Sequence, residues 1–205
     1  MKGVYMLAIQ YIDTVLDRLS KVTAGLEPVR EIGEFIAQTV KNGKKVYVMD
    51  RYSIVDAELV ERPSCLMLFR SFKNEGDAMT TGDIFLLSSF SADDESDLDL
   101  LTQARSLGAV VITISPEGSL SRSADRALTN KGSGENSVIS ISGIETRFCP
   151  VSGIVNTALA WALAAEVTES LLNQQMIPSV FTGEYLADKS GKNIEARKKY
   201  LSNGY

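Results

Sequence analysis

The sequence contains no histidine. A Ser-His-Asp triad, a histidine general base and a histidine-rich metal site are therefore all excluded. Any acid–base catalysis would depend on Asp, Glu, Lys, Tyr or Cys side chains. We expect neither a metal ion nor a cofactor.

Cysteine is also scarce, because Cys65 and Cys149 are the only two among 205 residues. The N-terminus lacks the apolar core and the small-residue cleavage site of a signal peptide. Two distant cysteines without a secretion signal are expected to be free thiols. The longest apolar stretch, around residues 158–165, is too short to span a bilayer. We therefore expect a cytoplasmic protein.

Blocks rich in Lys and Arg are absent, and the formal net charge is −5. Nucleic acid and anionic membranes are accordingly poor partners for this chain. The hydrophobic residues, at 44%, and the charged residues, at 23%, are typical of a globular protein. The length suits one sizeable core, so residues 1–205 are expected to form a single domain.

The chain opens with two segments of helical pattern. Apolar residues recur at three- and four-residue spacing over 6–19 and again over 29–40. Pro28 suits the first turn of the second helix and Gly43 its end. These patterns predict an N-terminal helical pair within residues 1–43.

Short apolar runs follow, and they predict five strands: Val46–Met49, Cys65–Phe69, Ile84–Leu87, Ala109–Ile114 and Val138–Ile141. Helical patterns lie between these runs at 53–61, 95–107 and 121–127, and a long one follows the last run, from after Pro150 to about Gln174. A final helical pattern lies at 193–201, within a C-terminal tail over 178–205. This alternation predicts an α/β fold with a parallel sheet covered on both faces. In such sheets ligands bind beyond the carboxyl ends of the strands, which here are followed by 50–53, 88–96 and 115–118.

The central stretch TTGDIFLLSSFSADDESDLDLLTQARSLGAVVITIS resembles the centre of a SIS (sugar isomerase) domain. Gly82-Asp83, Ser89-x-Ser91, Gly108 and Ser115 fall at the positions typical of that family. The segments PVSGIVNTALAWALAAEVTESLL and IPSVFTGEYLADKSGKNIEARKKY are similar to a bacterial branch with unassigned substrates. The resemblance covers most of the chain.

This resemblance implies a three-layer αβα sandwich with a five-stranded parallel sheet and a phosphosugar-binding function. Members isomerise sugar phosphates, act as etherases or sense sugar phosphates, and most are dimers or tetramers with sites near subunit interfaces. We therefore expect a homo-oligomer that binds a sugar phosphate or a similar small anion.

The serine loop, Ser88 to Ser96, is the first candidate site. The resemblance implies that Ser88, Ser89 and Ser91 bind phosphate, and Ser115 follows the next strand in the same way. An alternative is purely structural, because Ser91-Ala-Asp-Asp94 matches a helix capping box.

The acids of this loop weaken the case for phosphate. Asp93, Asp94 and Glu95 favour the positive end of the helix dipole, and they would repel a phosphate by about 1 to 4 kcal/mol per contact. Ala92 stands where the family has a glycine, which restricts the backbone. Phosphate binding at a drifted site and simple capping both remain open.

Arg51 and Ser53 form the second candidate site. The family often has a glycine-rich turn ending in Ser at this point, whereas this chain keeps Ser53 alone. The Arg51 guanidinium could replace the lost backbone donors as a phosphate partner. Alternatively, Arg51 pairs with Asp50 or with an acid of a neighbouring loop.

Glu58 is the candidate catalytic base, because isomerases of the family carry a glutamate in an Ala-Glu-Leu context. Proton transfer between C1 and C2 of a sugar needs such a carboxylate. The alternative is a solvated helical acid. The family's histidine, usually on the long C-terminal helix, is absent, and neither Asn156 nor Thr157 can replace it as a base. Three functions follow: sugar-phosphate binding, isomerisation through Glu58, or a ligand-free structural or regulatory role at an oligomer interface.

Overall fold

The structure, a computed structural model, describes residues 4–132, 136–182 and 189–205. Its centre is a five-stranded, all-parallel sheet in the order β2-β1-β3-β4-β5. The strands are β1 (Val46–Asp50), β2 (Phe69–Ser71), β3 (Ile84–Ser88), β4 (Val110–Ser115) and β5 (Arg126–Thr129). Two helices, α1 (Val4–Thr23) and α2 (Glu27–Lys41), precede β1. The predicted fold class and helical pair are confirmed.

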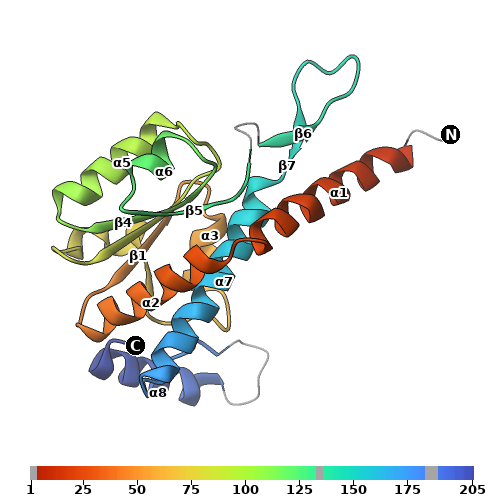
Figure 1. Cartoon of the computed structure of the whole chain (residues 1–205). Coiled ribbons are helices and arrows are strands. Elements are labelled where there is room, and N and C mark those ends of the chain that lie inside the picture. The colour runs from red at the N-terminus through yellow and green to blue at the C-terminus, as the bar shows by residue number, and fades with distance from the viewer. Residues whose placement is uncertain (1–3, 133–135, 183–188) are drawn as a thin grey trace.

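Helices cover both faces of the sheet (Figure 1). α2 and α7 (Ser152–Asn173) pack on one face, and α5 (Glu95–Ser106) and α6 (Ser119–Ser123) on the other. The shorter helices and the last one are α3 (Ile54–Asp56), η1 (Ala57–Glu61, a π-helix), α4 (Phe72–Glu75), η2 (Gly76–Ala78) and α8 (Lys189–Asn203). Strand β1 is buried throughout, with Val46 and Val48 facing one core and Tyr47 and Met49 the other.

The fifth strand is not the one predicted. β5 comes from Arg126–Thr129, and its first two residues lie at the end of the helical pattern predicted over 121–127. The predicted run around Val138 instead contributes β6 (Ser137–Ile139) to an antiparallel hairpin with β7 (Phe148–Pro150). β5 is an edge strand in which only Leu128 is buried, so it lacks the continuous apolar run that marks a strand buried on both faces.

The second predicted strand was also misplaced. β2 occupies Phe69–Ser71, and only Phe69 lies in the predicted range. Cys65–Leu68 pairs with the C-terminal segment instead, because Phe181 N donates to Cys65 O and Met67 N donates to Ser179 O, both at 2.9 Å. The apolar side chains Leu66 and Leu68 are buried in the main core, so the apolar character of this run reflects burial rather than membership of the sheet.

The N-terminal half of α1 and the β6–β7 hairpin project from the body of the molecule (Figure 1). The apolar stripe that predicted α1 faces solvent: the exposed fractions of Met6, Ile9, Ile12 and Leu16 are 68%, 58%, 54% and 58%. Both cysteines are free, as predicted. Among the described residues, no helix is long and apolar enough to cross a bilayer.

Candidate functional site

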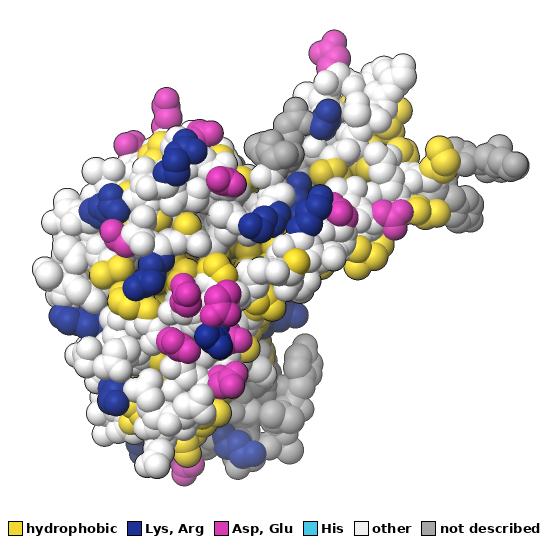
Figure 2. Space-filling model, in the orientation of Figure 1, with side chains coloured by type: hydrophobic (Ala, Val, Ile, Leu, Met, Phe, Trp, Pro, Cys, Tyr) yellow, Lys and Arg dark blue, Asp and Glu magenta, His cyan; other side chains and the backbone are white. Residues whose placement is uncertain are grey.

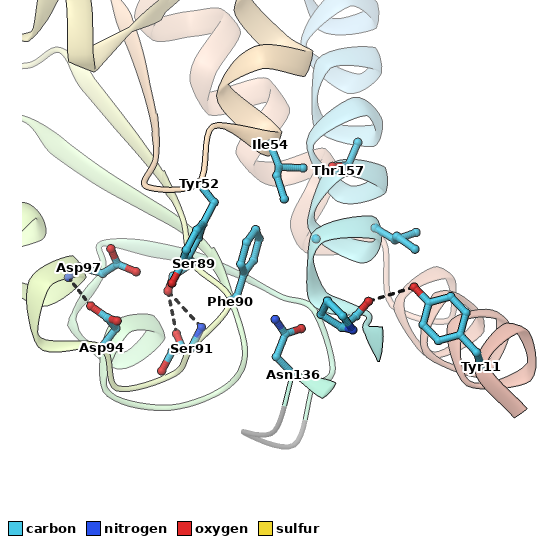
Figure 3. Close-up of a pocket in the computed structure, with 13 residues that line it drawn as sticks. Tyr11, Tyr52, Ile54, Ser89, Phe90, Ser91, Asp94, Asp97, Asn136 and Thr157 are labelled. Atoms are coloured by element: carbon cyan, nitrogen blue, oxygen red, sulfur yellow. Dashed lines mark hydrogen bonds between the residues drawn. The ribbon is translucent and has the colours of Figure 1, made fainter. Parts of the chain in front are cut away.

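The strand order fixes where a ligand crevice should lie. β2 and β3 lie on opposite sides of β1, so the loops that follow β1 and β3 diverge at this point of the sheet. Such a switch point opens a crevice beyond the carboxyl ends of parallel strands. A cavity of about 810 Å³ lies there, between these two loops and the start of α7 (Figure 3).

One wall of this cavity is apolar and aromatic. The rings of Tyr52 and Phe90, which follow β1 and β3, stack with centroids 5.2 Å apart and planes at 12°. Ile54 and Ile154 line the same space and are both about half exposed. Tyr11 reaches the cavity from α1, and its hydroxyl donates to the carbonyl of Pro150 at 3.0 Å.

Ser89 and Ser91 form part of the polar lining (Figure 3). The Ser89 hydroxyl donates to the Ser91 carbonyl at 3.0 Å and accepts from the Ser91 amide at 3.2 Å. The Ser91 hydroxyl in turn accepts from the Asp93 amide at 3.3 Å. Two of the predicted ligand-binding residues therefore lie at the cavity, where their hydroxyls stabilise the turn.

The predicted capping box at Ser91 is wrong. α5 begins at Glu95 and its N-cap is Asp94, whose carboxylate accepts from the Asp97 amide at 3.1 Å. Ser91 lies three residues before this cap and therefore cannot reach the first turn of the helix. Asp93 turns to the neighbouring loop and accepts from the Ser119 amide at 2.8 Å. Hydrogen bonding to the Ser119 side chain, and then to this amide, holds the pKa of Asp93 below its ordinary value.

Ala92 has a packing role in this loop. It is buried, and its carbonyl accepts from the Leu120 amide at 2.9 Å. A Cβ added to Gly118 would lie only 2.4 Å from the Ala92 Cβ. The methyl group of Ala92 therefore fits because residue 118 is a glycine. The loop after β3 and the loop after β4 pack directly against each other at this point.

The charge of the cavity is negative. Asp94 and Asp97 line it, and no Lys or Arg is among the described residues that do. Asp97 is 5% exposed and its Oδ1 has no hydrogen-bond partner among the described residues. Burial raises the pKa of Asp97, while the nearby Ser89 hydroxyl and Arg51 oppose the rise.

Arg51 lies beside the cavity and pairs with a loop acid. Its Nη1 is 2.6 Å from Asp94 Oδ1 and 3.9 Å from Asp97 Oδ1. The alternative of an ion pair with a loop acid is confirmed. Any role of Arg51 toward a ligand remains a prediction, and it would require the guanidinium to leave Asp94.

The turn after β1 is held by a carboxylate of the chain itself. Asp50 is 1% exposed and accepts from the amides of Tyr52, Ile54 and Val55 at 2.8 to 2.9 Å. Ser53 adopts a left-handed conformation with φ 57°, and its hydroxyl accepts from Lys73. Backbone donors that could have held an anion are thus occupied by Asp50, and Ser53 does not line the cavity.

Ser88 and Ser115 lie beneath the site rather than in it. They are 1% and 0% exposed, and neither lines the cavity. The Ser115 hydroxyl donates to the Pro116 carbonyl at 3.0 Å. The Ser88 hydroxyl accepts from Asn156 at 3.0 Å, which links β3 to α7.

Glu58 lies on the π-helix η1 and does not line the cavity. Its carboxylate pairs with Arg62 and accepts from the Trp161 indole N–H at 3.1 Å. Within one chain the carboxylate is therefore held away from the cavity by two partners. Thr157 lines the cavity, whereas Asn156 is fully buried behind it.

Comparison of the sequence with protein-family models finds no match, and no curated protein matches it. Solved structures do match the fold. A phosphoheptose isomerase from Francisella tularensis has a TM-score of 0.61 at 15% identity, and one from Neisseria gonorrhoeae has 0.62 at 12%. Each comparison covers 82% of this chain and 100% of the other. The chain has the SIS fold.

A further SIS-fold neighbour was solved with a ligand. It is an Escherichia coli CFT073 protein in complex with a sugar phosphate, with a TM-score of 0.51 at 18% identity. The comparison covers 85% of this chain and 94% of that one. At these identities the likeness establishes the fold of this chain and not its ligand.

Several cavity residues were not predicted from the sequence. Tyr52 and Phe90 could have been noticed, because each is an aromatic residue two positions after the end of a buried strand. Nothing in the sequence marks Asp97 as a cavity residue, since an acid is common in the first turn of a helix such as α5. Tyr11 and Asn136 reach the site through tertiary packing alone. Within the described residues, no cluster of His, Cys, Asp and Glu is placed to hold a metal ion.

Proposed function

We propose that this protein binds a sugar phosphate, or a similar small polyhydroxylated anion, in the cavity at the carboxyl ends of β1 and β3. The observation that supports this function is the cavity itself, at the switch point of a parallel sheet, with Ser89 and Ser91 in its lining. The sugar phosphate bound to a neighbour of the same fold is consistent with this ligand class.

The lining suits the sugar part of such a ligand. Carboxylate oxygens of Asp94 and Asp97 can accept from sugar hydroxyls, and the Asp97 Oδ1 has no other hydrogen-bond partner among the described residues. The apolar faces of Tyr52 and Ile54 can contact the ring carbons. The phosphate would lie toward Arg51, a cation that pairs with Asp94 at the edge of the acidic lining.

A panel of sugar phosphates and their unphosphorylated sugars tests this proposal in a thermal-shift assay. A ligand at 100 times its dissociation constant stabilises the fold by about 2.7 kcal/mol, which raises Tm by about 5–10 °C in a chain of this size. We expect such a shift with at least one sugar phosphate, and a smaller one after Ser89→Ala or Ser91→Ala. A flat response across the panel at millimolar levels would favour the ligand-free structural role.

Two neighbouring acids provide a matched pair of variants for the same assay. Asp94→Asn removes a charge from the cavity, releases Arg51 and retains a good N-cap residue, so affinity for the sugar phosphate should rise about tenfold. Asp93→Asn makes the same charge change outside the lining and should alter affinity less than about twofold. Equal effects of the two variants would contradict binding beside Asp94.

We also propose a homo-oligomer, formed through the exposed stripe of α1 rather than through α7. Met6, Ile9, Ile12 and Leu16 present a continuous apolar face, whereas most apolar residues of α7 are buried in the core. Light scattering at micromolar concentration should show a dimer or tetramer, and Ile9→Asp combined with Ile12→Asp should give a monomer. Leu201→Asp, at a comparably exposed position on α8, serves as control. A monomeric wild-type protein would contradict this assembly.

A further inference from the structure

A second cavity, of about 300 Å³, lies where α1 passes the base of the β6–β7 hairpin. Among the described residues, four cationic side chains line it, Arg18, Lys21, Lys131 and Arg147, against one carboxylate, Asp17. Their formal charge of +3 contrasts with the net charge of −5 for the whole chain. Lys and Arg side chains gather on this part of the surface (Figure 2).

These cations converge from segments far apart in the sequence. Arg18 and Lys21 lie one turn apart on α1, Lys131 follows β5, and Arg147 directly precedes β7. Bringing four like charges to one cavity costs electrostatic free energy, which a bound anion would offset. The Lys21 Nζ already lies 2.7 Å from Asp17 Oδ2, and Arg147 has an interaction of its own. Arg18 and Lys131 have no carboxylate partner among the described residues, so their charges are the ones that a bound anion would offset.

Arg18 is the most informative member of the cluster. It is 7% exposed, and its hydrogen bond among the described residues goes from Nη1 to the Ser152 hydroxyl at 3.2 Å. No carboxylate of the described chain lies within ion-pair distance of its guanidinium. A guanidinium has five N–H donors, and a buried charge without an ionic partner is costly. Burial accordingly lowers the pKa of Arg18.

We propose that this cluster is a binding site for a small multivalent oxyanion, a phosphate or pyrophosphate group, distinct from the cavity at the serine loop. The planar fork of Arg18 can bind two oxygens of such a group, and the lysines add flexible charge around it. The two cavities share no lining residue within the part of the chain that the structure describes, although Tyr11 and Thr14 of α1 line one each. An anion bound here would tie α1 to the hairpin beside the proposed sugar-phosphate site.

Isothermal titration with inorganic pyrophosphate at low ionic strength tests the site in the intact chain. Lys21→Gln and Lys131→Gln should each weaken binding about tenfold, the loss typical of one charge-assisted contact. Asp17→Asn should strengthen it several-fold, because it removes the carboxylate and frees Lys21. The exposed lysines are chosen because replacing the buried Arg18 would also change the stability of the fold.

Two further variants serve as controls. Lys198→Gln removes one positive charge from an exposed position on α8, and it should leave pyrophosphate affinity unchanged. Ser89→Ala should do the same, because Ser89 lines the other cavity. Three results would each overturn the proposal: equal weakening by Lys198→Gln, loss of binding in Ser89→Ala, or no heat from the wild-type protein at millimolar pyrophosphate. Failure here would leave the sugar-phosphate assay, which depends on Ser89, unaffected.

Discussion

Incubated with aldose and ketose phosphates, the protein is expected to give no conversion above the uncatalysed background. Isomerisation needs a base and a general acid that lie against the same substrate. The chain has no imidazole, and Glu58 is bonded to Arg62 and Trp161 outside the cavity. Losing an acid–base partner lowers a rate by about 10²- to 10⁴-fold. NMR detection of deuterium incorporation at C2 in D₂O measures even slow turnover.

The outcome that would restore the isomerase hypothesis is specific. Rapid exchange at C2, abolished by Glu58→Gln with an unchanged Tm, would show that Glu58 reaches a substrate. Glu61→Gln provides the matched control, since Glu61 is an exposed acid three residues further along the same π-helix. An equal loss in both variants would point to damage of the helix rather than to a base.

The contrast between β1 and β5 shows which parts of the fold can be predicted from the sequence. β1, β3 and β4 are buried on both faces, so their apolar runs predict them directly. β5 is an edge strand that begins with an exposed Arg126, and its pattern was outweighed by the apolar residues around Val138. Local composition indicates burial, but only packing decides which sheet a buried run joins.

At the candidate site, too, the sequence predicts the location of the loops but not their contacts. Strand ends placed the serine loop and the turn after β1 at one edge of the sheet, and this placement is confirmed. The hydrogen-bond partners of the loop carboxylates could not be predicted from the sequence. Several backbone amides lie within reach of Asp50, Asp93 and Asp94, and only the folded structure shows which of them are bonded. Sequence therefore predicted which loops lie at this edge of the sheet, whereas only tertiary structure shows that their donors serve the chain's own carboxylates.

Asn156→Leu is expected to cause a large loss of stability. Asn156 is fully buried, and its Nδ2 donates to the Ser88 hydroxyl and the carbonyls of Ser89 and Ile114 at 2.9 to 3.3 Å. Its Oδ1 accepts from Asn130 at 2.6 Å. One amide thus joins α7 to the ends of β3 and β4 and to the segment after β5.

Leucine has a similar volume and none of these groups, so several buried polar atoms would lose their partner. Each costs about 1–3 kcal/mol, and a total of roughly 4 kcal/mol should lower Tm by about 8–16 °C. Asn156→Asp should be at least as harmful, because its second oxygen would face the carbonyls of Ser89 and Ile114. Thr157→Val, one residue along the helix at the cavity surface, should change stability by less than about 0.5 kcal/mol. Calorimetry on the three variants measures these differences in Tm. A Tm of Asn156→Leu within about 2 °C of the wild type corresponds to roughly 1 kcal/mol or less. That result would show that the hydrogen bonds of Asn156 add little to the stability of the fold.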